Sequence, residues 1–133
     1  MPHFSDDQLS SIAQQFHDLS ATIGQFRLDE IRRGAKLADP DIVRLLGLQL
    51  SLANTSSALY LQAALVILAD ADQVATRVTA STHEANAAMK TLQLVNKVIS
   101  IGSAAGVLAT AVITGDMGQI ESAADGIHAA IVG

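Results

Sequence analysis

The chain of 133 residues contains no cysteine, no tryptophan and only two prolines. Without cysteine it has no disulfide, no thiolate metal site and no cysteine nucleophile. Three phenylalanines and one tyrosine are its only aromatic residues, yet half of the chain is apolar. The core must therefore be built from leucine, isoleucine, valine and alanine, and of these leucine and alanine favour helices.

Basic residues are also scarce, with eight Lys and Arg against thirteen Asp and Glu, for a net charge of −5. They form no block and are not interleaved with aromatic residues, so we expect no nucleic-acid partner. The opening MPHFSDDQLS is acidic, whereas a secretory signal starts with basic residues followed by apolar ones. We expect a cytoplasmic protein, or one exported without a conventional signal peptide.

The first predicted helix covers residues 5–34. Ser5 and Gln8 have the spacing of a capping box at its start. The apolar residues that follow recur at steps of three and four, which places them on one helical face. They are Leu9, Ile12, Phe16, Leu19, Ile23 and Phe26. Gly34 is the predicted stop.

A second helical segment begins at the Asp-Pro pair of residues 39–40, where proline suits the first helical position. Positions at steps of three and four then keep one unbroken rhythm that starts at Val43, includes Leu50 and ends at Gly102, and all of them are apolar except Ser57, Ser81 and Gly102. This pattern predicts one very long or kinked central helix over residues 40–113. The weak point is TASTHE, residues 79–84, which contains a second candidate capping box. Helices of globular proteins rarely exceed about 25 residues, which favours the broken or bent form.

Two further segments complete the predicted architecture. ALYLQAALVILA, residues 58–69, is apolar nearly all round, which predicts a central buried position. Gly115 and Asp116 separate the preceding segment from a last helix at 117–131, so residues 98–131 are expected to form an αα-hairpin. The sequence therefore predicts a single all-α domain over 1–133, a helical bundle of three to four antiparallel helices.

The stretch of residues 98–113 has no charge and contains Gly102 and Gly106 in the GxxxG spacing. It is shorter than the roughly 20 apolar residues of a membrane-spanning helix. Glycines at this spacing let helices approach closely, and we expect them to accommodate the last helix or a second copy of the chain. The predicted oligomer or membrane seam consists of Val95, Ile99, Gly102, Gly106, Ala109 and Ile113.

No nucleophile elbow, P-loop or dinucleotide fingerprint occurs. Glu121, Asp125 and His128 share a helix face but extend over about 10 Å, too far for one metal ion. Asp70 and Asp72 are two residues apart and so point to different sides of a helix. We therefore expect no enzyme, no metal site and no cofactor.

A cluster of basic residues surrounds the first predicted loop. Its members are Arg27, Arg32, Arg33, Lys36 and Arg44. The cluster is a candidate contact for an acidic partner or a phosphate, but Asp29, Glu30, Asp39 and Asp41 lie beside it. Local charge balance is therefore the simpler interpretation.

The leading functional prediction is a non-catalytic interaction or scaffold protein that self-associates through its apolar helical seams. One alternative is membrane action, because residues 85–131 resemble in composition the organisation of helical pore-forming toxins. That resemblance implies insertion of the apolar hairpin 98–131 as an oligomer. The second alternative is an immunity or chaperone-like protein that masks an apolar helix of another protein.

Overall fold

A computed structural model describes residues 6–62, 71–91 and 94–132 of the chain. The described residues form five helices and no strand, which confirms the all-α class. The helices are α1 (Asp6–Arg32), α2 (Pro40–Gln62), α3 (Ala71–Thr91), α4 (Val95–Thr114) and α5 (Met117–Val132).

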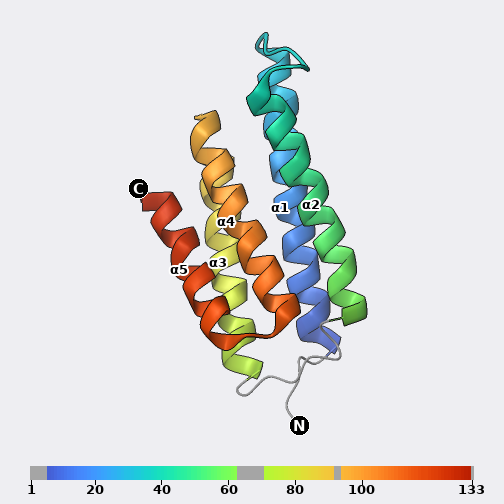
Figure 1. The fold of residues 1–133 in the computed structure, drawn as a ribbon, viewed down its shortest axis with the longest axis vertical. Coiled ribbons are helices and arrows are strands. Elements are labelled where there is room, and N and C mark those ends of the chain that lie inside the picture. Colours follow the sequence, from blue (N-terminus) through green and yellow to red (C-terminus); the bar gives the residue numbers. More distant parts are fainter. Residues whose placement is uncertain (1–5, 63–70, 92–93, 133) are drawn as a thin grey trace.

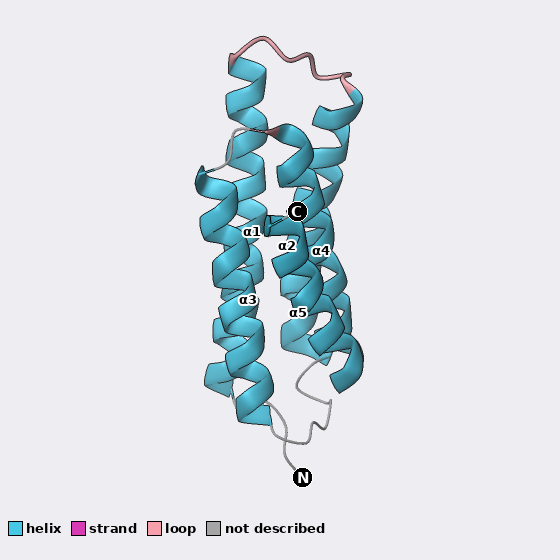
Figure 2. Cartoon of the chain, turned by 90° about the vertical axis from the view of Figure 1, so that its left-hand side faces the viewer, coloured by secondary structure: helices cyan, strands magenta, loops and turns pink. Residues whose placement is uncertain are grey.

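The helices alternate in direction and form two layers. Figure 1 shows α1, α3 and α5 running one way while α2 and α4 run the other. In the turned view of Figure 2, α1 and α3 lie on one side, and α2, α4 and α5 lie on the other. Within the second layer α4 packs against both α2 and α5. This arrangement gives the bundle two broad outer surfaces.

The prediction for residues 40–113 needs a correction. The structure has three separate helices there, α2, α3 and α4, and each runs opposite to the one before it (Figure 1). An unbroken rhythm of three and four does not distinguish one helix from several when the connections between them preserve the phase. α2 ends at Gln62 and α3 begins at Ala71, while α3 ends at Thr91 and α4 begins at Val95. Most of the segment 58–69 lies outside the described residues.

The predicted capping box at 79–84 is also wrong, because these residues lie inside α3. Ser81 and Thr82 are buried, and the Thr82 hydroxyl donates to the Val78 carbonyl oxygen at 2.9 Å. Ser81, the predicted N-cap residue, therefore lies in the interior of a continuous helix and does not start a new one.

The first interhelical connection follows the predicted glycine stop. Gly34 has a φ of +113°. Its N–H donates to Ile31 O at 3.0 Å, and Ala35 N–H donates to Glu30 O at 3.0 Å, which is the Schellman pattern. At the start of α2, Asp39 O accepts the Val43 N–H at 3.0 Å.

The Asp39 side chain turns away from α2. Its Oδ2 atom accepts from Lys36 N–H at 2.9 Å, so it stabilises the loop. Pro40 begins α2 as the sequence indicates, and Asp39 supplies the helix with a backbone acceptor only.

The α4–α5 connection agrees with the sequence prediction in detail. Gly115 adopts the left-handed conformation with φ 78°, and its N–H donates to Ala111 O at 2.9 Å. Asp116 Oδ1 accepts from Gln119 N–H at 3.1 Å, the expected N-cap bond. α4 and α5 therefore form a tight antiparallel hairpin.

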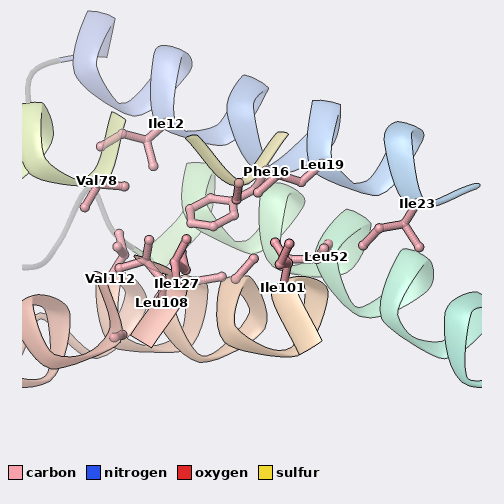
Figure 3. Packing of buried hydrophobic residues seen from close by; sticks show 14 of the residues in the cluster. Ile12, Phe16, Leu19, Ile23, Leu52, Val78, Ile101, Leu108, Val112 and Ile127 are labelled. Carbon is pink, nitrogen blue, oxygen red and sulfur yellow. The ribbon is translucent and has the colours of Figure 1, made fainter. Parts of the chain in front are cut away.

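One apolar cluster holds the two layers together. The α1 stripe predicted from the sequence lies in it, and Phe16, Leu19 and Ile23 are fully buried. Figure 3 shows these side chains meeting residues from the other helices, including Leu52, Val78, Ile101, Leu108, Val112 and Ile127. Burying a side chain of this size contributes about 1.5–3 kcal/mol. The core thus accounts for most of the apolar periodicity in the sequence.

Buried hydroxyls join α1 to α2. Ser20 Oγ donates to Gln49 O at 2.7 Å, and Ser56 Oγ donates to Ala13 O at 2.7 Å. Because both bonds cross between the helices, they fix the register of this hairpin. Figure 1 shows that the hairpin extends beyond the ends of α3 and α4.

Candidate functional site

Charged side chains are distributed unequally over the helices. α2 has no charged residue from 45 to 62, and α4 has none from 98 to 114. In contrast, α1 carries seven charged residues and α3 carries four, while α5 carries two, Glu121 and Asp125. The outer surface of the α2–α4–α5 layer therefore differs chemically from that of the α1–α3 layer.

A shallow groove of about 730 Å³ runs over this second layer. α4 forms its floor, while α2 and α5 form its walls, and none of its lining residues is charged. They are Leu48, Ser51, Ser103, Ala104, Gly106, Val107, Thr110, Ala111, Gln119, Ser122, Ala123 and Gly126. We call the surface formed by these residues the uncharged face.

The middle of the uncharged face is open to an approaching surface. A Cβ atom placed on Gly106 has no neighbour within 4 Å. The adjacent Val107 is 61% exposed, although it is a large apolar residue. The Thr110 hydroxyl donates back to Gly106 O at 3.1 Å, so it has a partner within its own helix. The centre of the face can therefore lose water without leaving this hydroxyl donor unpaired.

The two glycines of the predicted GxxxG motif have different environments. A Cβ atom on Gly102 would lie 3.0 Å from Ile23 Cδ1 and 3.2 Å from Leu48 Cδ1. Gly102 thus permits close packing of α4 on α1 and α2, whereas the sequence analysis assigned it to the last helix or a second copy. Gly106 lines the open groove.

The predicted seam residues lie on both sides of α4. Ile99, Gly102 and Ala109 are buried within this chain. Val95 and Ile113 are half-buried and pack against the same core. Only Gly106 also belongs to the uncharged face, so most of the predicted seam serves the internal packing of the bundle.

The heptad rhythm of the sequence in α2 is one residue out of phase with the side of the helix that the bundle buries. The heptad positions Val43 and Leu50 are 55% and 54% exposed. Ile42, Leu45 and Leu52 form the buried side instead. α2 therefore has a second apolar stripe outside the core, a feature that periodicity alone did not reveal.

The basic cluster is largely neutralised by its own surroundings. Arg33 pairs with Glu30 at 2.7 Å and Arg32 with Asp29 at 3.6 Å. Arg27 Nε donates to the Ile42 carbonyl oxygen at 3.3 Å. The side chains of the remaining two members, Lys36 and Arg44, are exposed.

The polar face of α5 contacts α3. Asp125 forms an ion pair with Arg77, and His128 Nδ1 lies 2.9 Å from Glu84 Oε1. Within the described ranges, no three His, Cys, Asp or Glu side chains come together to hold a metal ion. Glu121 is exposed on the same helix. Sequence reasoning missed these two contacts because their partners are more than forty residues apart.

The start of α3 carries Asp72, one of the two neighbouring aspartates considered in the sequence. Asp72 accepts from Gln8 Nε2 at 2.6 Å across the α1–α3 interface, and Asp70 lies outside the described residues.

Comparison with known proteins gives no further assignment: no family model, no curated protein and no solved structure matches this chain.

Proposed function

We propose that the protein is a non-catalytic helical interaction module that associates with copies of itself through the uncharged face. The observation that carries this proposal is the groove over α2, α4 and α5, which has no charged lining residue although the chain carries twenty-one charged residues, eight basic and thirteen acidic.

Electrostatics favours this face over the others for contact between copies. Two molecules of net charge −5 repel each other, and the repulsion falls off over a Debye length of about 8 Å at physiological ionic strength. Contact through the uncharged face brings no pair of carboxylates into the interface. Contact through the α1–α3 layer would require the dehydration of residues such as Asp18, Asp29 and Asp72, which is costly.

The shape of the face also suits a helix–helix contact. Packed helices have axes about 8–10 Å apart, depending on the side chains between them. Small residues such as Ser103, Gly106 and Ser122 permit the short end of this range, and Val107 supplies an exposed apolar side chain. Val43 and Leu50 form a separate exposed apolar stripe on α2 and are not among the residues that line the groove.

The test is sedimentation equilibrium of the wild type, Val107→Glu and Ala87→Glu. Val107→Glu places a charge in the centre of the face, and an unpaired buried charge costs several kcal/mol. We expect it to weaken association at least about tenfold, since 1.4 kcal/mol corresponds to that factor. Ala87 is exposed on α3 in the other layer, so Ala87→Glu is the matched control and should associate like the wild type.

Thr110→Glu provides a second variant on the same face, in case Val107→Glu alters the fold. Circular dichroism checks that every variant keeps the helical content of the wild type. A wild type that stays monomeric at the highest soluble concentration contradicts the proposal. So does an association that neither face variant weakens.

Membrane action is a second candidate function, and α4 is the observation that favours it. Of the helices in the described residues, only α4 is long and apolar enough to cross a bilayer, and half of the apolar window lies buried within the bundle. Flotation with anionic vesicles at neutral and acidic pH tests this candidate. Binding of the wild type that Val107→Glu abolishes would support it, and absence of binding at both pH values would contradict it.

A further inference from the structure

We infer that two copies of this chain pack antiparallel, with a two-fold axis that passes close to Gly106 of α4. This inference rests on the proposed association through the uncharged face and adds the orientation of the second copy. It comes from a separate observation, the distribution of charge along the length of the bundle.

Basic residues collect at one end of the molecule. The end where α1 finishes and α2 starts carries the five residues of the basic cluster, and Lys90 and Lys97 lie near the corresponding ends of α3 and α4. Seven of the eight basic residues are therefore at this end, with four acidic residues, Asp29, Glu30, Asp39 and Asp41. Seven positive and four negative charges leave this end at +3.

Acidic residues collect at the opposite end. Asp7, Asp72 and Asp116 stand at or beside the first turns of α1, α3 and α5, and Glu121 follows in α5. The eighth basic residue, Arg77, is paired with Asp125. Together with Asp6, the first residue of α1, the four carboxylates outside this pair make five, which give the described part of this end a charge of −5.

Helix dipoles explain why acidic residues suit the starts of three helices that share one end. The same placement has a consequence for association. Two copies packed side by side in parallel would bring the two positive ends together and the two negative ends together. Antiparallel packing brings each positive end beside a negative end, so the charge pattern favours this orientation.

The position of Gly106 makes the antiparallel arrangement symmetric. Lys97 precedes Gly106 by nine residues and Asp116 follows it by ten. With a rise of 1.5 Å per residue, the two charges lie about 14 Å and about 15 Å from Gly106 along the chain direction. A two-fold axis at Gly106 therefore sets Lys97 of each copy at the level of Asp116 in the other.

Charge decides orientation here more than affinity. Exposed ion pairs are weak, and each changes a dissociation constant by about 1.5- to 5-fold. Because the symmetric dimer contains this pair twice, we expect Asp116→Asn to weaken the dimer by about 2- to 25-fold at low salt and to have a smaller effect at high salt. Asparagine caps helices about as well as aspartate, so this variant removes the charge and keeps the α5 N-cap.

The direct test uses pulsed electron paramagnetic resonance on spin-labelled full-length chains. The absence of native cysteine makes single labelling sites easy to introduce. Thr114 and Asn96 are exposed on α4, eight residues after and ten residues before Gly106. One sample carries Thr114→Cys on both copies, and a second mixes Thr114→Cys with Asn96→Cys chains.

The two orientations predict opposite results. In the antiparallel dimer the Thr114 sites are separated by about 24 Å along the axis, plus the lateral spacing, and the mixed sites by only about 3 Å along it. In a parallel dimer the Thr114 sites are level, and the mixed sites are about 27 Å apart along the axis. A long Thr114–Thr114 distance with a short mixed distance supports the inference, and the reverse overturns it.

The failures of the two proposals can be told apart. A purely monomeric protein gives no intermolecular distance in either sample and overturns both proposals. A dimer with neighbouring Thr114 sites, still disrupted by Val107→Glu, overturns the orientation alone.

Discussion

The two glycines of α4 offer a matched pair of substitutions that tests the packing in this region. Alanine is about 1 kcal/mol more favourable than glycine in a helix interior. A Cβ atom on Gly106 meets nothing within 4 Å, so Gly106→Ala should gain nearly this full amount in the monomer. For 133 residues the entropy of unfolding is about 0.28 kcal/mol/K, and the expected rise in melting temperature is about 4 °C.

Gly102→Ala should behave differently, although the substitution and the helix are the same. Its Cβ atom would lie 3.0 Å from Ile23 Cδ1 and 3.2 Å from Leu48 Cδ1, so both side chains must move. Overpacking a core costs about 1–3 kcal/mol, which cancels or exceeds the helical gain. We expect a free energy of unfolding between the wild-type value and about 2 kcal/mol below it.

The assay is urea unfolding followed by circular dichroism, at concentrations low enough for the monomer to dominate. Equal slopes for the three proteins are required for the comparison, because a change in slope reports a change in exposed surface. Equal stabilisation by both alanines would show that α4 does not pack closely on α1 and α2 at Gly102. Destabilisation by Gly106→Ala would show that the groove is filled by the chain itself.

Three further predictions concern the framework of the bundle. Phe16→Ala removes a fully buried ring and should lower the free energy of unfolding by about 3–5 kcal/mol in urea titration; a loss below 1 kcal/mol would contradict the central position of Phe16. Ser56→Ala removes the bond to Ala13 O and should cost about 1 kcal/mol by thermal unfolding, whereas no change in melting temperature would contradict a stabilising role. Asp116→Ala removes the N-cap of α5 and should cost about 1 kcal/mol, with faster hydrogen exchange at the start of α5 and not elsewhere; uniform exchange would argue against a local cap.

The ends of several helices were predictable from sequence because their signals are local. Gly34, Pro40 and Gly115 act through their own backbone conformations, and Asp116 caps α5 through a residue three positions away. The α1 stripe was also readable, since one face of this helix meets the whole core. Such features depend on neighbours in the chain and not on the tertiary fold.

The course of the chain between 40 and 113 was not predictable in the same way. Heptad phase continues through the ends of α2 and α3, so periodicity gives no sign of the two reversals. The rhythm also runs through Val43 and Leu50, although Ile42 and Leu52 are the residues that face the core. When a helix is apolar on two sides, only its packing partners decide which side is buried.

The uncharged face was only partly visible in the sequence. The lack of charge in residues 98–113 was evident, but its continuation onto Ser51 of α2 and Ser122 of α5 depends on how the helices are layered. The charge polarity of the bundle has the same origin, since Arg32 and Lys97 come to one end only through alternating helix directions. Both features belong to the tertiary structure.

We propose the uncharged face as a contact surface between copies of this chain. The most direct test is the molar mass of the wild type in solution, measured by sedimentation equilibrium over a wide concentration range. We expect a reversible rise from 13.8 kDa to twice that value as concentration increases. A mass that stays at 13.8 kDa throughout would contradict it.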